Sequence, residues 1–318
     1  MPRPEDWREV LIVAAATRRG LVAALADDGR PDAAAAVLGL DARAARVTAA
    51  ALEELGYLEG DDGAAGGGNG AYRLTPRGRA LLGPQPDGSD PAAEALLSAR
   101  MIEHHLRLPE VLESGAAVAN LAPGGGPGEH GRFVRAMRHV ARPRAPELAA
   151  ALPPPRPGAR LLDVGGAPGT YAFALAGAGW RVTVLDLPGP LEVTRSDLEA
   201  GGIAAVPGDM TEALPPGPWD GIYLGNVSHL FGPETAAALL ARAGSALSPG
   251  GVLAVQDFVR GRSPRAARFA VSMLLATDAG GTYALHDYRR WLEAAGCPLE
   301  RTVDIAGGEH LLLIGRRP

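Results

Sequence analysis

A glycine-rich loop that follows a short apolar run is the stretch of this sequence best suited to bind a ligand. Residues 161–171 read LLDVGGAPGTY, and an alanine-rich segment continues to Gly179. This order is typical of a strand that ends near Asp163, a tight turn and the start of a helix. Glycine lets a ligand approach the main chain, and the free N–H groups of a helix start point into the same space. We therefore expect a small-molecule site at the carboxyl end of this strand.

The residues of the loop disfavour a dinucleotide. A G-x-G-x-x-G fingerprint holds a pyrophosphate on a helix N-terminus, but Ala167 occupies its second glycine position and Thr170 its third. Asp163 would repel a doubly charged anion, and Pro168 removes one N–H that could have bound it. A cationic ligand suits the loop better.

The elements around this loop alternate between strand and helix patterns. Strands are expected at residues 160–164, 181–186, 203–206, 221–224, 252–258, 302–305 and 311–315. Helices are expected between most of them, at residues 170–178, 191–200, 234–247, 265–277 and 287–295. The alternation predicts an α/β, Rossmann-like fold with a doubly wound, mostly parallel, seven-stranded sheet.

Composition indicates a globular protein and excludes several kinds of chemistry. The 318 residues, 47% of them hydrophobic, suffice for two domains of about 150 residues each. All 31 basic residues are Arg, which excludes Schiff-base and phosphate-loop lysines. The single Cys297 excludes an internal disulfide and fits a reducing compartment. No apolar run approaches the roughly 18 residues of a membrane span, and no signal peptide is evident, so we expect a cytoplasmic protein.

The N-terminal part has the pattern of a winged helix. Helical periodicity over 6–26, as one long or two short helices, precedes short helices at 31–38 and 42–55 and a hairpin over 57–74. Winged helices often bind DNA, but residues 1–85 hold ten Arg against twelve Asp and Glu, and the net charge of the chain is −5. Because affinity for a duplex depends on neutralising phosphates, we expect dimerisation or scaffolding rather than nucleic-acid binding.

The glycine loop resembles the signature of class I S-adenosylmethionine-dependent methyltransferases. Their D-x-G-x-G-x-G reads here D-x-G-x-A-x-G from Asp163 to Gly169, and their L-x-P-G-G turn is present at 247–251. S-adenosylmethionine carries a sulfonium and an ammonium where a dinucleotide carries phosphates, which matches the acid beside the loop. The resemblance implies this cofactor, bound by Asp163, Gly165, Gly166 and Gly169.

Further side chains after the next two strands agree with this cofactor. Asp186 ends the second expected strand, where a carboxylate can accept two hydrogen bonds from a ribose diol, and Leu187 follows it. Asp209 and Met210 follow the third strand, where a carboxylate can take the adenine amino group and a thioether can cover its face. In isolation Asp186 can equally be a helix cap and Asp209 a turn residue. Their joint spacing behind the glycine loop favours the cofactor.

A histidine after the fourth strand is the candidate for catalysis. Residues 224–231 read LGNVSHLF. Together with the winged helix, this resembles the two-domain small-molecule O-methyltransferases, which include plant caffeic-acid-type and bacterial natural-product enzymes and form homodimers through the N-terminal domain. The resemblance implies that His229 is the general base and that Asn226 lies at the cofactor. The alternative is a histidine that only packs at a strand end. A positioned imidazole contributes roughly 10²–10⁴-fold to the rate when it removes the proton of a hydroxyl.

Departures from the plant pattern leave the partner of His229 open. Leu230 and Thr282 stand where plant members have acids, and Gln256 stands at the place of their strand-five glutamate. Asp257 follows directly. We expect Asp257 to orient His229, with the amide of Gln256 as the alternative.

The acceptor pocket is expected to lie beside the histidine. Its candidate residues, each with core packing or solvation as the alternative, are Phe133, Met137, Phe269, Met273 and His105. His105 and the histidine before it do not share a helix face, so a metal pair is not expected. No acidic cluster follows the fourth strand, which argues against a magnesium-dependent mechanism.

Linker composition divides the chain into three parts. Residues 83–91 read GPQPDGSDP, a typical linker, and PPPRPG precedes the first strand of the sheet. We expect a winged-helix dimerisation domain over 1–95, a helical segment over 96–152 that contributes to the substrate pocket, and a cofactor-binding domain over 153–318. Within the middle segment, helices are expected at 92–114 and 133–152, and the glycine-rich stretch 121–132 between them is either a lid or a surface connection.

These observations lead to a cytoplasmic homodimer that transfers a methyl group from S-adenosylmethionine to a hydroxyl of an aromatic or polyketide-like small molecule, without a metal. The same fold and cofactor also serve carbon or nitrogen methylation, hydroxylation and ring rearrangement. A winged-helix regulator that senses S-adenosylmethionine is the alternative from another class, and the acidic N-terminal part argues against it. The sequence does not identify the acceptor.

Overall fold

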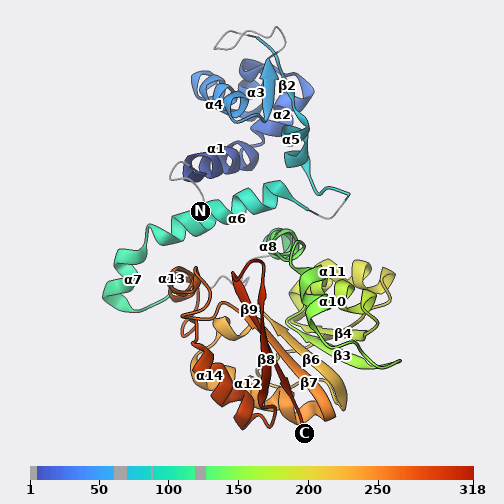
Figure 1. Ribbon diagram of the computed structural model, residues 1–318. Coiled ribbons are helices and arrows are strands. Elements are labelled where there is room, and N and C mark those ends of the chain that lie inside the picture. The colour runs from blue at the N-terminus through green and yellow to red at the C-terminus, as the bar shows by residue number, and fades with distance from the viewer. Residues whose placement is uncertain (1–5, 61–69, 87–88, 119–126) are drawn as a thin grey trace. The chain divides into compact units, whose positions relative to one another are not determined.

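The computed structural model divides the chain into two compact units, Met1–His104 and His105–Pro318. The residues that it describes are 6–60, 70–86, 89–118 and 127–318 (Figure 1). Residues 121–126, the first half of the glycine-rich stretch 121–132, therefore lie outside the described residues, and residues 127–132 belong to a helix instead of a loop. Most of the loop of the expected hairpin also lies outside the described residues.

The N-terminal unit has the helices and the hairpin of a winged helix. Gly20, at φ +76°, separates the first two helices, because glycine adopts the left-handed conformation at low cost. Asp41 caps α4 by accepting the N–H of Ala44 at 2.8 Å. The elements are α1 (Asp6–Arg18), α2 (Leu21–Asp27), α3 (Pro31–Leu38), α4 (Ala42–Glu54), β1 (Leu58–Gly60), β2 (Tyr72–Leu74), α5 (Pro76–Arg79), η1 (Ala80–Leu82) and α6 (Pro91–His105).

The C-terminal unit is built on one seven-stranded sheet in the order β5-β4-β3-β6-β7-β9-β8. The first five strands along the chain pair in parallel, and β9 runs antiparallel to both of its neighbours. The expected doubly wound, mostly parallel sheet is confirmed. Its strands are β3 (Arg160–Val164), β4 (Arg181–Asp186), β5 (Ala204–Pro207), β6 (Trp219–Gly225), β7 (Leu247–Asp257), β8 (Leu299–Ile305) and β9 (His310–Arg316).

Helices cover both faces of this sheet, each over its own apolar core (Figure 1). One core joins the sheet to α9, α10 and α11, and the other joins it to α12 and α14. Buried leucines at a helical spacing, such as Leu191 and Leu198, form these contacts. The helices of the unit are α7 (Leu108–Ser114), α8 (Pro127–Ala141), α9 (Ala145–Ala151), α10 (Thr170–Gly177), α11 (Pro188–Ala200), η2 (Ser228–Leu230), α12 (Pro233–Ala246), α13 (Ala266–Ala276) and α14 (Leu285–Ala294).

Two expected helices are each interrupted. The segment 92–114 forms α6 and α7, and the segment 133–152 lies in α8 and α9. Pro109 stands in the first turn of α7 and Pro143 between α8 and α9. Proline has no N–H for the helical hydrogen bond and clashes with the preceding turn, which ends a helix before it. Among the described helices, none is long and apolar enough to cross a membrane.

Candidate active site

The glycine loop packs so tightly that side chains are excluded from it. A Cβ at Gly166 would lie 2.6 Å from Cγ of Asp163, and one at Gly169 would lie 2.5 Å from Cδ2 of Leu198. Gly165 and Gly169 also have φ values of +69° and +83°, which residues with a Cβ rarely adopt. The loop at the carboxyl end of β3 therefore needs glycine at these positions, because Asp163 and Leu198 occupy the space that a side chain would take.

Two buried carboxyl groups stand at the ends of β3 and β4. Asp163 is 1% exposed, and its Oδ2 has no hydrogen-bond partner among the described residues. Burial, followed by the nearby Asp186 carboxyl, raises the pKa of Asp163 to about 8. Burial also raises the pKa of Asp186 to about 6, although Asp186 accepts the N–H groups of Ala167 at 2.9 Å and Leu187 at 2.7 Å. At neutral pH Asp186 is therefore mostly ionised, whereas Asp163 keeps its proton until a cation or a donor group stabilises the carboxylate.

The residues after β4 and β5 border the same loop. Leu187 is 43% exposed at the end of β4. Met210 is 9% exposed. Its Cε packs against Gly165, where it would lie 3.1 Å from a Cβ on that glycine. Asp209 accepts both the N–H and the hydroxyl of Thr211 at 2.7 Å through Oδ1, so one of its oxygens is engaged in the local turn. The apolar side chains of Leu187 and Met210 and the carboxyl groups of Asp186 and Asp209 thus follow the two strands next to the loop.

His229 and Asp257 form a buried hydrogen-bonded pair. His229 lies in the short helix η2 after β6 and is 6% exposed, whereas Asp257 ends β7 and is fully buried. His229 Nδ1 is 2.6 Å from Asp257 Oδ1, and the main-chain N–H of His229 donates to Oδ2 at 3.1 Å. The carboxylate therefore holds both the ring and the backbone of the histidine. With the proton of the neutral ring on Nδ1, Nε2 is the nitrogen that can accept another.

Gln256 points away from this pair, because successive residues of a strand face opposite sides. Its Nε2 donates to the hydroxyl of Tyr171 at 3.1 Å, and its Oε1 accepts the hydroxyl of Tyr223 at 3.2 Å. Asn226 follows β6 in the left-handed conformation, with φ +58°, and its N–H donates to the main-chain oxygen of Gln256 at 2.8 Å. Through its bond to Tyr171, the side-chain amide of Gln256 ties the end of β7 to the helix start that follows the glycine loop.

An aromatic cluster lies against the histidine. Phe269, on α13, contacts the ring of His229 edge-on with centroids 4.8 Å apart, and Phe258 stacks on Phe269 at 4.1 Å. The ring of His310 also contacts Phe258, with centroids 4.1 Å apart. Met273, one helical turn after Phe269, is 4% exposed. The structure thus brings Phe269 into contact with His229 and places Met273 on the same helix.

The other three expected pocket residues lie elsewhere on helices of this unit. Phe133 and Met137 are partly buried on α8, which packs on α10 and α11, the helices that follow the glycine loop and β4. His105 is exposed, and its Nε2 lies 3.4 Å from Oγ of Ser272 on α13.

Several polar side chains of the site were not anticipated from the sequence. His310 is 2% exposed, and Nδ1 has no partner among the described residues. Burial, together with the positive charge of Arg144, lowers the pKa of His310 to about 4, so the ring is neutral at physiological pH. For Tyr171 the sequence offered one signal of a place in the site, because this residue directly follows the glycine loop. The positions of His310 and Arg144 depend on contacts between distant segments.

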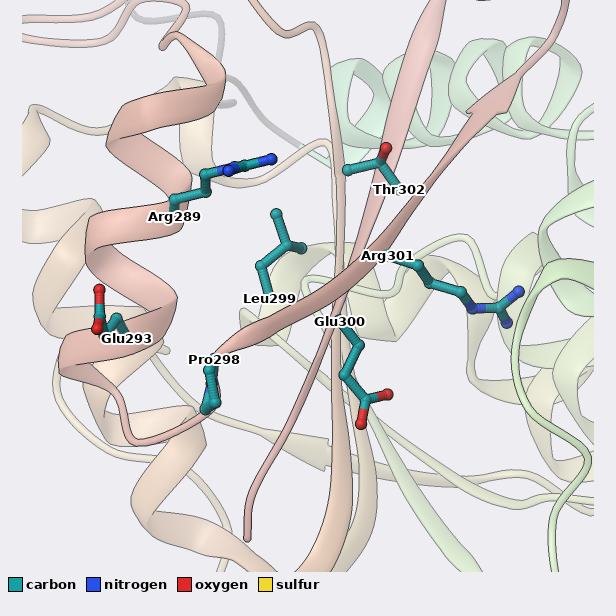
Figure 2. Close-up of a pocket in the computed structure, with 7 residues that line it drawn as sticks. All are labelled: Arg289, Glu293, Pro298, Leu299, Glu300, Arg301 and Thr302. Atoms are coloured by element: carbon teal, nitrogen blue, oxygen red, sulfur yellow. The ribbon is translucent and has the colours of Figure 1, made fainter.

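A shallow groove on the same unit is separate from this site. It has a volume of about 460 Å³ and runs between α14 and the edge strand β8 (Figure 2). Charged side chains dominate its lining, which consists of Arg289, Glu293, Pro298, Leu299, Glu300, Arg301 and Thr302. None of the residues discussed above contributes to it. Within the described parts of the chain, no three His, Cys, Asp or Glu side chains gather as a metal-binding group.

Comparison with known proteins places the chain in a family. Residues 133–302 match a family described as a methyltransferase domain. TcmO, the tetracenomycin polyketide synthesis 8-O-methyl transferase of Streptomyces glaucescens, is 31% identical over 301 residues, which cover 88% of this chain and 84% of TcmO. The mitomycin 7-O-methyltransferase MmcR shares the fold with a TM-score of 0.80 at 23% identity, over 99% of this chain and 95% of MmcR. NcsB1, an O-methyltransferase from neocarzinostatin biosynthesis solved with S-adenosylmethionine and 2-hydroxy-5-methyl naphthoic acid, has a TM-score of 0.74 at 23% identity, over 98% and 96% of the two chains.

The fold and the match together define a methyltransferase of class I. More narrowly, the chain belongs to the two-domain small-molecule O-methyltransferases of the plant and bacterial natural-product type, and its cofactor is S-adenosylmethionine.

Proposed function

We propose that this enzyme methylates a hydroxyl of an aromatic or polyketide-like small molecule, with His229 as the general base and without a metal. The observation that carries the proposal is the 2.6 Å contact between His229 Nδ1 and Asp257 Oδ1 at the carboxyl edge of the sheet. It orients Nε2 as the free acceptor of a proton. The aromatic side chains of Phe258 and Phe269 beside His229 suit a flat acceptor.

The residues around the glycine loop fit the cofactor. Asp163 offers a buried oxygen without a partner among the described residues, which suits the α-ammonium. We assign the ribose to Asp186 and the adenine to Leu187, Asp209 and Met210. Asn226, whose Oδ1 is likewise buried and unpaired in the described part of the chain, faces the amino-acid part. When bound, S-adenosylmethionine supplies a methyl group made electrophilic by the sulfonium.

In this proposal His229 Nε2 takes the proton of the acceptor hydroxyl as that oxygen becomes the nucleophile. The ring then carries a positive charge, which the buried carboxylate of Asp257 stabilises. Because Asp257 also binds the N–H of His229, the base is held in place before the acceptor arrives. Positioning of this kind converts a bimolecular encounter into a reaction between fixed groups.

Substitution of His229 tests this assignment. His229→Ala should retain affinity for S-adenosylhomocysteine and lower kcat by roughly 10²–10⁴-fold, and Asp257→Asn should lower kcat in the same direction by disturbing the ring. The measurement is methyl transfer to a panel of hydroxynaphthoic acids and hydroxyanthraquinones, followed by mass spectrometry. Unchanged turnover in His229→Ala would refute the base. Methylation of carbon or nitrogen in the products would replace the O-methylation proposal.

A homodimer through the N-terminal unit is also proposed. Several large apolar side chains of that unit are exposed, with Val37 at 83%, Val47 at 61% and Trp7 at 48%. Light scattering of the full chain should give twice the mass of one chain, and a monomer at micromolar concentration would contradict the proposal.

A further inference from the structure

Tyr171 lies at the end of a chain of three hydrogen-bonded side chains. The hydroxyl of Tyr223 donates to Gln256 Oε1, and Gln256 Nε2 donates to the hydroxyl of Tyr171. Tyr223 and Gln256 are fully buried, and the two tyrosine rings meet edge to face with centroids 5.5 Å apart. These contacts fix both the ring and the oxygen of Tyr171 in the first turn of α10.

The direction of these bonds leaves Tyr171 with a hydrogen to donate. Gln256 spends its only carbonyl oxygen on Tyr223, so the Tyr171 oxygen receives an N–H and its own hydrogen points elsewhere. The Asn226 side chain is also hydrogen-bonded to this hydroxyl, and within the described residues the bond from Gln256 is one that the Tyr171 oxygen receives and not one that it donates. A partly buried donor without an acceptor is costly, and a ligand with an acceptor oxygen would remove that cost.

The sheet places this hydroxyl among two acceptors that are unpaired within the described residues. In the sheet β6 lies between β3 and β7, with Asp163 opposite Tyr223 and Gly225 opposite Gln256. The Tyr171 hydroxyl, bonded to Gln256, is therefore at the carboxyl edge near the end of β6. The two acceptors are Asp163 Oδ2 and Asn226 Oδ1, which are buried at the ends of β3 and β6.

Ionisable groups of both signs, Arg144 and Asp163, lie near the Tyr171 hydroxyl. Burial raises the pKa of Tyr171, against the opposing effects of the Gln256 hydrogen bond, the Arg144 cation and the Asn226 side chain, so the hydroxyl keeps its hydrogen at neutral pH. Arg144 Nε is itself buried without a partner among the described residues. Arg144 also pairs with Glu309 at 3.1 Å. A hydroxyl donor near this cation, together with two acceptors that are unpaired among the described residues, complements a zwitterionic amino acid.

We propose that Tyr171 binds the α-carboxylate of S-adenosylmethionine by donating its hydroxyl hydrogen to one carboxylate oxygen, while Asp163 and Asn226 face the α-ammonium. Tyr171 is then a cofactor-binding residue that reads the amino-acid end of the ligand. The inference rests on the cofactor and not on the base assigned to His229, so either assignment can fail without the other.

The test compares two probes that differ in the amino-acid end. S-adenosylhomocysteine carries the carboxylate, whereas 5′-methylthioadenosine lacks the whole amino-acid group. Tyr171→Phe should raise the Kd for S-adenosylhomocysteine about 10- to 100-fold, the range for a hydrogen bond to a charged group, and leave the Kd for 5′-methylthioadenosine within about twofold. Titration calorimetry gives both values in the absence of an acceptor.

Tyr223→Phe is the matched control, because it deletes a hydroxyl from the same chain whose acceptor lies within the protein. The ratio of the Kd for 5′-methylthioadenosine to that for S-adenosylhomocysteine should stay at the wild-type value in Tyr223→Phe and fall in Tyr171→Phe. An unchanged ratio in Tyr171→Phe overturns the proposal. If that variant does not fold, the wild-type protein is titrated with decarboxylated S-adenosylhomocysteine, and an affinity equal to that of S-adenosylhomocysteine overturns the proposal as well.

Discussion

Asp163 carries a buried carboxyl that is protonated at neutral pH while no cation is bound. Burial and the neighbouring Asp186 raise the pKa of Asp163 to about 8, and the α-ammonium of the cofactor would pair only with the ionised form. Binding should therefore expel about one proton per site at pH 7. We expect the affinity for S-adenosylhomocysteine to rise between pH 6 and pH 8. Calorimetric titrations in two buffers of different ionisation enthalpy measure the released proton, and Asp163→Asn should release none.

The same carboxyl should lower the stability of the ligand-free protein as the pH rises. A carboxyl with an ordinary pKa of about 3.9 when unfolded and about 8 when folded binds more protons in the folded state between these values. Its contribution to the free energy of unfolding is complete below about pH 4 and is lost as the pH rises through about 8.

Asp163→Asn removes this titration. The variant should gain about 5 kcal/mol over the wild type between pH 4 and pH 8, because the two pKa values differ by about four units. Denaturant unfolding at both pH values measures the gain, and a pH-independent difference would show that the carboxyl is ionised in the free protein.

At the scale of elements, the glycine loop was predictable because its residues are consecutive. Asp163 and Gly169 lie six positions apart in one strand-turn-helix unit, so their types and order define the geometry. The hydrogen bond between Tyr171 and Gln256 joins residues 85 positions apart. Only the order of the strands brings them together, and no local pattern indicates it. The pairing of His229 with Asp257 was within reach because both follow strand ends that a parallel sheet places side by side.

Element boundaries were less predictable for two different reasons. Pro143 in the middle of an expected helix was a visible signal for a break. The start of β7 at Leu247, five residues before the expected one, carried no such signal, because it depends on pairing with distant residues, namely Trp219 of β6 and the C-terminal segment. There Gly250 N–H donates to the main-chain oxygen of Arg317 at 2.8 Å, and Arg317 N–H donates to that of Gly251 at 2.9 Å.

Gly169 gives a prediction for the loop as an element. Its φ is +83°, and a Cβ at this position would lie only 2.5 Å from Leu198, so Gly169→Ala should shift the loop against α11. We expect a loss of about 1–3 kcal/mol in the free energy of unfolding and weaker binding of S-adenosylhomocysteine.

Gly177, at the end of α10, is the control for this substitution. A Cβ there meets nothing within 4 Å, and its backbone is helical. Gly177→Ala should leave binding unchanged and stabilise the protein by about 0.5–1 kcal/mol. Equal stability and affinity in the two alanine variants would mean that the loop does not need glycine.

At the scale of the whole molecule, the two units have separate apolar cores. The core of the N-terminal unit draws on residues 13–92, whereas the two cores of the C-terminal unit draw on residues 148–314. All the residues assigned to the cofactor and to proton transfer lie in the second unit. Stability gained from the cofactor should therefore be confined to that unit.

Scanning calorimetry of the full chain tests this division of stability. A ligand that binds only folded protein adds RT ln(1 + [L]/Kd), about 2.7 kcal/mol at 100 times Kd. For a unit of about 200 residues, that corresponds to a rise of roughly 5–10 °C in Tm. We expect S-adenosylhomocysteine to raise the transition of the C-terminal unit by this amount and to leave that of the N-terminal unit in place. A single transition that moves as a whole would show that the two units unfold together. If only the N-terminal transition moved, the cofactor would bind to the N-terminal unit, which contradicts the assignment of its site to the C-terminal unit.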